Sequence, residues 1–214
     1  MTTPASTTTA VDIIDLLSGA AASSDIAPIR GHRPQAREQA QRSFSALFEP
    51  ADPGTFPVAD RYAVAAYVSG LHGFPAASAF YSDLLADEDA ELSAPVAALV
   101  RATATSGPFG TYREEGLQGE NTSGTAFDAS EDRAGAFDTR LRAAFAHAHL
   151  LVFRPRESSG AALAALADAG WSDDDIVTLS QLVAFLSFQL RTAWGLRVLA
   201  GSDPARDESN GERR

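Results

Sequence analysis

The side chains that can carry out chemistry in this sequence are a few histidines and tyrosines, and no cysteine accompanies them. His72 lies in the sequence GLHGFP, and His147 and His149 lie two residues apart in AFAHAHLL. Without cysteine, the chain has no disulfide, no thiolate metal site and no cysteine nucleophile of its own. Proton transfer by histidine or tyrosine is the chemistry that these residues leave open.

Each histidine has a catalytic and an ordinary interpretation. His72 lies at a predicted turn between two helices, where it either transfers protons in a pocket or is a plain turn residue. On a helix, the side chains of His147 and His149 point about 200° apart, which is poor geometry for a two-histidine metal site. His149 follows Phe145 by four residues and lies near Val152, which favours an inward core histidine. We expect no metal ion and no cofactor.

Tyr62 and Tyr81 lie in the two predicted helices that flank His72, and they could donate phenolic protons into a shared pocket. Tyrosines with apolar neighbours are also common in cores and interfaces, where the hydroxyl is bonded. Arg191 needs a carboxylate or carbonyl partner if its helix is enclosed, and that partner is either a ligand or a group across a subunit contact. The aspartates at 173–175 are explained by helix capping without a metal ion.

Composition and charge exclude several classes of function. The 214 residues are 45% hydrophobic and carry a net charge of -11, which permits a substantial core and repels phosphate backbones. We therefore expect no nucleic-acid partner. No basic segment precedes an apolar run at the N-terminus, and no apolar segment is long and charge-free enough to span a membrane. The expected location is the cytoplasm, with no membrane partner.

Helices must position these residues, because no run alternates with a period of two. The fold class is therefore all-α. The longest element, from Trp171 to Ala200, carries a broad apolar stripe and further apolar residues outside it, so it is expected to be a central helix with several neighbours, from this chain or another subunit. Ser180, Gln181, Gln189 and Arg191 are its polar exceptions. The other helices are expected at 11–17, 34–48, 57–71, 75–87, 89–105, 133–153 and 158–169.

Glycine and proline predict the irregular segments. Residues 22–34 favour irregular backbone because they contain Pro28, Gly31 and Pro34. Residues 106–130 hold five glycines and one proline, so no regular element is expected there. A loop of this length is commonly a lid, an interface arm or a disordered segment. The polar ends, 1–9 and 201–214, are expected to be loose, which leaves a single domain over 10–200.

The segment DRYAVAAYVSGLHGFPAASAFY, residues 60–81, resembles the helical hairpin of the alkylhydroperoxidase D (AhpD)-like and carboxymuconolactone decarboxylase (CMD) superfamily. Residues 171–199 resemble the closing helix of the peroxidase-related branch of that superfamily. The likeness covers most of residues 57–200. It implies an AhpD-like helical bundle, assembly into a homo-oligomer, and a role in antioxidant defence or small-molecule catabolism.

In redox-active members of this superfamily, a glutamate stands twelve residues before the first cysteine of a Cys-x-x-Cys pair, and a histidine follows the second cysteine by four. That spacing falls here on Tyr62, Phe74, Ala77 and Tyr81. All four family groups are replaced here. They are the thiolate that attacks peroxide, the thiol that resolves the sulfenate and the two groups that transfer protons. The resemblance therefore implies a cysteine-free member that is not a thiol peroxidase by itself.

Two functions remain open. One is an enzyme like the lactone decarboxylases of the superfamily, which use histidine and glutamate for acid–base chemistry. Its candidate catalytic residues are Tyr62, His72, Tyr81 and His149. The other is a non-catalytic scaffold that binds a small apolar molecule or assembles with a cysteine-containing AhpD-like homologue.

Overall fold

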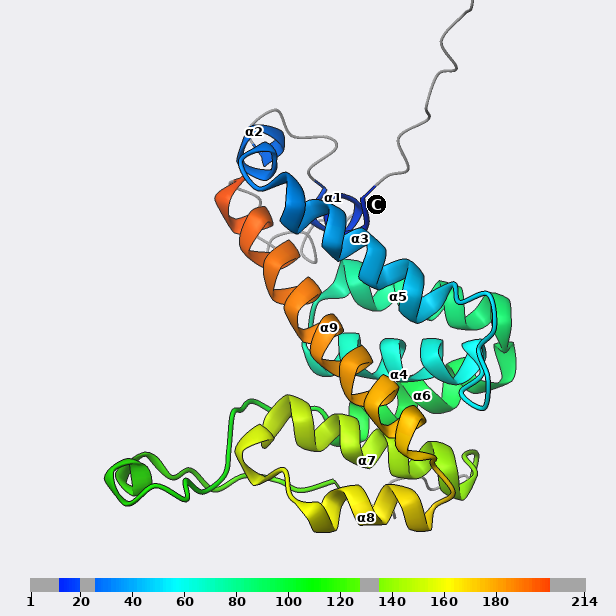
Figure 1. Cartoon of the computed structure of the whole chain (residues 1–214), viewed down its shortest axis with the longest axis vertical. Helices are drawn as coiled ribbons and strands as arrows, with labels where there is room; N and C mark the ends of the chain where they lie inside the picture. Colours follow the sequence, from blue (N-terminus) through cyan, green and yellow to red (C-terminus); the bar gives the residue numbers. More distant parts are fainter. Residues whose placement is uncertain (1–11, 20–25, 128–134, 201–214) are drawn as a thin grey trace, which may run out of the picture. The chain divides into compact units, whose positions relative to one another are not determined.

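The computed structural model describes residues 12–19, 26–127 and 135–200. These residues are mostly helical and contain no β-strand (Figure 1), which confirms the all-α class. The expected loose ends, 1–9 and 201–214, lie outside the described residues. The elements are α1 (Ile13–Ser18), α2 (Ile26–Gly31), α3 (Pro34–Phe48), α4 (Val58–Leu71), α5 (Pro75–Glu88), α6 (Ala90–Thr103), the 3₁₀ helix η2 (Glu115–Glu120), α7 (Thr139–Phe153), the 3₁₀ helix η4 (Pro155–Glu157), α8 (Gly160–Asp168) and α9 (Asp173–Leu199).

The chain divides into two compact units. The first unit lies within residues 1–44 and 191–214, and the second unit comprises residues 45–190. The division falls inside α3 and inside α9, so each of these helices contributes residues to both units. A single domain over 10–200 stays a prediction.

In the first unit, buried ion pairs hold α1 and α2. Asp12 caps α1, and the guanidinium of Arg30 lies 2.5 Å from Asp12 Oδ1 and 2.8 Å from Asp15 Oδ1. The expectation of irregular backbone over 22–34 is wrong for residues 26–31, which form α2. Pro28 does not interrupt this helix because it lies in the first turn, where a backbone N–H has no intrahelical partner.

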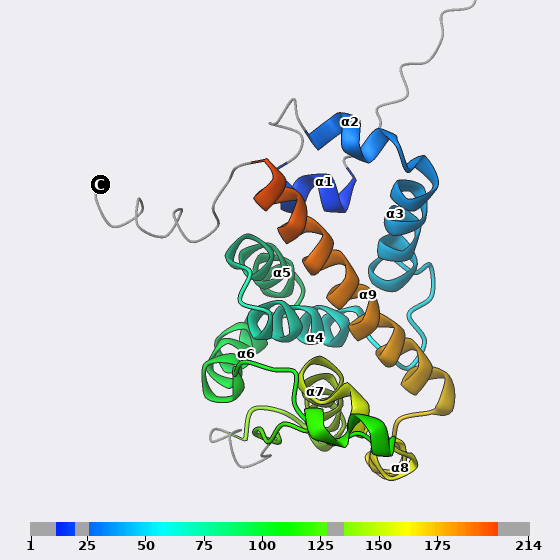
Figure 2. The ribbon, with the colours of Figure 1, turned by 90° about the vertical axis from the view of Figure 1, so that its left-hand side faces the viewer.

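In the second unit, α4 is the most enclosed helix. It packs against α5, α6 and α7 (Figure 2), and ten of its fourteen residues are buried. A helix that is apolar around its circumference belongs inside a core. Gly70 permits its close approach to α6, since a Cβ there would lie 2.7 Å from the methyl carbons of Val100.

Glycine and proline set the ends of the α4–α5 hairpin at the expected places. Gly73 turns the chain with a φ of 62°, a conformation that favours glycine. Pro75 then occupies the first turn of α5, where its missing N–H costs nothing. The connection before α4 is held by the buried guanidinium of Arg61, which donates to the backbone carbonyls of Leu47, Pro53 and Phe56.

The start of α9 is anchored within the second unit by charges. Arg140 of α7 lies 3.2 Å from Asp175 of α9 and 3.5 Å from Asp60 of α4. The indole N–H of Trp171 donates to the Arg140 carbonyl at 2.9 Å, and Ser172 caps the helix by accepting from the N–H of Asp175. The sequence signal of serine followed by aspartates therefore marks a real helix start.

Other helix ends differ from expectation. α7 begins at Thr139 rather than near 133, because Asp138 accepts from the N–H of Leu141 and so caps the helix there. Residues 106–127 are not wholly irregular: they contain η2 and an antiparallel bridge in which Gly110 and Thr122 exchange backbone hydrogen bonds. Residues 128–130 of that stretch lie outside the described residues. Contrary to expectation, α9 is long and apolar enough to cross a membrane. This is a matter of length and composition only, and core helices can share both features.

Candidate functional site

The four positions that match the superfamily's redox site are buried on the α4–α5 hairpin. Phe74 and Ala77 are core side chains. The ring of Tyr62 stacks on Phe48 at 5.2 Å between centroids, and the ring of Tyr81 lies 5.5 Å from the same Phe48. The hairpin therefore brings the two tyrosines together around one aromatic ring, as packed side chains.

Tyr81 is bonded to the C-terminal helix. Its hydroxyl donates to Oε1 of Gln189 at 2.5 Å, and both side chains are fully buried. Burial raises the pKa of Tyr81 well above its usual value, and burial, followed by Glu49 and Glu88, raises the pKa of Tyr62. Both phenols are therefore neutral near neutral pH, and that of Tyr81 acts as a hydrogen-bond donor. Gln189 was visible in the sequence as a polar exception, but nothing in the sequence pairs it with Tyr81.

His72 lies directly after α4 and has a different partner. Its Nε2 is 3.3 Å from the hydroxyl oxygen of Ser187 on α9, and the side chain is half-buried. This contact fits a turn residue that joins the hairpin to α9. The structure thus places His72 against a helix hydroxyl.

His149 is a buried neutral histidine with one free nitrogen. Its side chain is 1% exposed, and its Nε2 lies 3.2 Å from the carbonyl oxygen of Thr103. Because a carbonyl can only accept, Nε2 carries the proton and Nδ1 keeps its lone pair. Among the described residues, Nδ1 has no hydrogen-bond partner. Burial lowers the pKa of His149, as does the charge of Arg154, so this lone pair is available near neutral pH.

His147 lies on another side of α7. Its Nε2 is 2.9 Å from the hydroxyl oxygen of Ser180 on α9, whereas His149 binds the end of α6. Burial also lowers the pKa of His147. The two histidines point to different elements, as the helical repeat predicted. Within the part of the chain that the structure describes, no group of three metal-binding side chains is placed to hold a metal ion.

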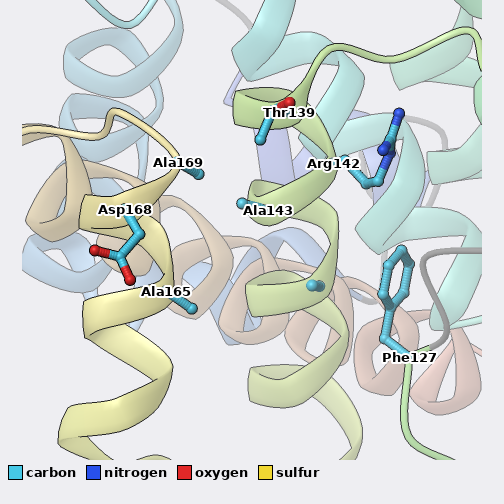
Figure 3. Close-up of a pocket in the computed structure, with 8 residues that line it drawn as sticks. Phe127, Thr139, Arg142, Ala143, Ala165, Asp168 and Ala169 are labelled. Carbon is cyan, nitrogen blue, oxygen red and sulfur yellow. The ribbon is translucent and has the colours of Figure 1, made fainter.

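A pocket of about 440 Å³ lies between α7 and α8 (Figure 3). Alanines from both helices form its walls, and one aromatic ring and three polar side chains complete it. In Figure 3, Ala165 of α8 and Ala169, the residue that follows α8, face α7, and the carboxylate of Asp168 is turned away from it. The lining residues are Phe127, Thr139, Arg142, Ala143, Ala146, Ala165, Asp168 and Ala169. Sequence reasoning missed this pocket, although alanines spaced three and four apart on neighbouring helices were a usable signal.

The pocket is adjacent to His149. Positions 142, 146 and 149 lie on one face of α7, because steps of four and three residues return to the same side of a helix. The ring of Phe127 lines the pocket and also lies 5.9 Å from the ring of His149. A buried nitrogen lone pair therefore lies next to the aromatic ring that borders the pocket.

Comparison with family models, with curated proteins and with solved structures finds no match for this chain.

Proposed function

We propose that this chain is a cysteine-free member of the AhpD-like/CMD superfamily, of its peroxidase-related branch, that binds a small and largely apolar molecule between α7 and α8. Its setting is antioxidant defence or small-molecule catabolism in the cytoplasm. One observation supports this proposal above the others. The hairpin positions that would hold redox groups are filled by packed Phe74 and Ala77, while open volume lies in the alanine-lined pocket.

The lining of the pocket indicates the kind of ligand. The volume falls within the range of about 300–1,000 Å³ that small-molecule sites occupy. Alanine walls offer methyl groups and no hydrogen-bond donors, so the body of the ligand is apolar. Thr139, Arg142 and Asp168 supply a hydroxyl, a guanidinium and a carboxylate at the lining, which favours one or two polar groups on the ligand.

A second candidate function is cysteine-independent acid–base chemistry in the same pocket. The observation that favours it is the unpartnered, unprotonated Nδ1 of buried His149 beside Phe127. If the Phe127 ring rotates aside, an O–H or C–H acid of a bound molecule can reach Nδ1 as a base. Tyr62 and Tyr81 do not line this pocket, so His149 is the candidate that this reaction would use.

The binding proposal is tested with an apolar fluorescent probe, 8-anilinonaphthalene-1-sulfonate, on the folded chain. Ala165→Phe places a ring in the pocket and is expected to weaken probe binding at least about tenfold. Ala167→Phe is the matched control, because Ala167 is an exposed alanine of the same helix outside the lining. Equal binding by both variants would contradict the pocket assignment.

Replacing His149 distinguishes the two candidate functions. A carboxylated lactone serves as probe substrate, and released carbon dioxide is measured. The acid–base candidate expects turnover that His149→Gln abolishes without loss of probe binding. The binding candidate expects no turnover by the wild-type chain. Consumption of cumene hydroperoxide with a thiol reductant by the purified chain would refute both.

A further inference from the structure

The helices α7 and α8 form a hairpin around the ligand pocket. They run in opposite directions (Figure 3), and the 3₁₀ helix η4 joins them at one end. The opposite end of the hairpin holds Thr139 of α7 and Ala169, the residue that follows α8, and both line the pocket. The pocket therefore lies between an end that the chain itself closes and an end that depends on noncovalent contacts.

Arg140 and Trp171 make two contacts at that second end. The indole N–H of Trp171 donates to the backbone carbonyl of Arg140 at 2.9 Å, and the guanidinium carbon of Arg140 lies 4.0 Å from the centre of the Trp171 ring. Arg140 directly follows Thr139 in the sequence. Trp171 comes two residues after Ala169. We call this pair the clasp, because it joins the first turn of α7 to the residues that follow α8.

The clasp is itself fixed by neighbouring helices of the second unit. The guanidinium of Arg140 lies 3.5 Å from Asp60 of α4 and 3.2 Å from Asp175 of α9. The side chain of Trp171 is 3% exposed, and its ring packs edge to face against Phe56 at 4.9 Å between centroids. A guanidinium bound to two carboxylates and an enclosed indole both have few alternative positions. The clasp is therefore a fixed point for the spacing of α7 and α8.

We propose that the clasp makes the pocket between α7 and α8 selective for narrow apolar ligands, such as an unbranched carbon chain. This inference rests on the proposed function, because it assigns a shape to the ligand of the same pocket. The alanines of the walls have short side chains, so contacts across the pocket do not set the distance between the helices. The clasp and η4 set it from the two ends. Helices in direct contact lie about 8–10 Å apart, so a clasped hairpin leaves a narrow gap.

Arg140 and Trp171 lie outside the pocket lining, so they act as positioning residues. Weakening the clasp lets α7 and α8 move apart at the pocket. A wider gap removes van der Waals contacts from a narrow ligand and makes room for a wide one. The two dissociation constants should therefore change in opposite directions. General loss of stability would weaken both ligands together, so their ratio separates a positioning role from a structural one.

The experiment compares decanoate, an unbranched chain, with adamantane-1-carboxylate, a cage of nearly the same carbon count. Both are measured on the full chain by displacement of 8-anilinonaphthalene-1-sulfonate. Wild type should bind decanoate at least about tenfold more tightly. Trp171→Phe keeps a ring beside Phe56 but loses the N–H donor, and Arg140→Met removes the guanidinium. Each variant should lower the preference for decanoate at least about threefold.

Tyr112→Leu is the matched control for the clasp variants. It removes a ring that lies 4.0 Å from the guanidinium carbon of Arg156, the same separation as in the clasp, and neither residue lines the pocket. Its preference for decanoate should equal that of wild type. Circular dichroism and thermal unfolding check that each variant is folded.

A further measurement leaves the clasp intact. Trp194→Phe makes Trp171 the only tryptophan of the chain, so acrylamide quenching of its fluorescence reports on the clasp. Bound adamantane-1-carboxylate should increase the quenching, because a wide ligand must push the clasp open, and bound decanoate should not.

The proposal is overturned if wild type binds the two carboxylates equally, if a folded clasp variant keeps the wild-type preference, or if bound adamantane-1-carboxylate leaves the quenching of Trp171 unchanged. Failure of the proposed function gives a different result. In that case Ala165→Phe and Ala167→Phe bind 8-anilinonaphthalene-1-sulfonate equally, whereas failure of the clasp alone leaves their difference in place.

Discussion

Replacing Tyr81 by phenylalanine removes one hydroxyl from the core of the second unit and tests how the α4–α5 hairpin is held to α9. The hydroxyl donates to Gln189 Oε1 at 2.5 Å, and neither side chain reaches solvent. The Nε2 of Gln189 already has no partner among the described residues. Tyr81→Phe therefore leaves the whole amide unsatisfied, which costs about 1–3 kcal/mol of unfolding free energy.

A double-mutant cycle separates this hydrogen bond from simple loss of packing. Gln189→Leu alone leaves the Tyr81 hydroxyl buried without an acceptor and should also cost about 1–3 kcal/mol. The double variant, Tyr81→Phe with Gln189→Leu, removes both polar groups, so it should be more stable than either single variant, with a coupling of about 1–3 kcal/mol. Urea denaturation followed by tryptophan fluorescence measures all four chains.

Tyr67→Phe is the matched control for Tyr81→Phe. The Tyr67 hydroxyl lies 2.8 Å from Thr103 Oγ1, which also donates to the carbonyl of Leu99. Thr103 thus keeps a partner after the substitution, and the expected cost is about 0.5–1.5 kcal/mol. The reasoning fails if Tyr81→Phe costs no more than Tyr67→Phe, or if the effects of Tyr81→Phe and Gln189→Leu simply add.

Two further predictions concern stability. Burial lowers the pKa of His147 and of His149, so below about pH 6.5 the unfolded chain binds protons that the folded chain does not, and stability falls by up to about 1.4 kcal/mol per pH unit for each histidine. Urea denaturation at pH values from about 7.5 to about 5, which bracket the titration of histidine, measures the unfolding free energy as a function of pH. His149→Gln should show a shallower dependence of that free energy on pH than the wild-type chain, and an identical dependence would disprove this prediction. Gly70→Ala should lower the unfolding free energy by about 1–3 kcal/mol, because the added methyl group clashes with Val100. Adding Val100→Ala should recover part of that stability, as measured by thermal unfolding. If it recovers none, the clash does not explain the loss.

The elements that local signals specify could be predicted from the sequence. Pro34 opens α3, Pro75 opens α5 and Ser172 caps α9, as expected from first-turn proline and capping rules. The helix α2 was missed because its stability comes from a distant contact. Arg30 binds Asp12, eighteen residues earlier in the chain, and no local pattern indicates that pair.

The candidate site was less predictable because its partners are far apart in sequence. Tyr81 binds Gln189 across 108 residues, and His72 contacts Ser187 across 115. The inward position of His149 follows from helical periodicity, but its tautomer, with the proton on Nε2 and the lone pair on Nδ1, depends on the Thr103 carbonyl, which the structure alone reveals. Arg191 is expected to need a carboxylate or carbonyl partner if its helix is enclosed, but its side chain is exposed.

The burial of Tyr81 bears directly on where chemistry can occur in this chain. A general acid must reach a substrate and must recover its proton from water or from another group afterwards. The Tyr81 hydroxyl is buried, its pKa is raised by burial, and its hydrogen bond goes to an amide that cannot supply a proton. Catalysis at the hairpin would therefore require α5 and α9 to separate. The pocket between α7 and α8 is bordered by Phe127, whose ring lies 5.9 Å from the ring of His149, which favours that pocket as the place to look for a ligand or a substrate.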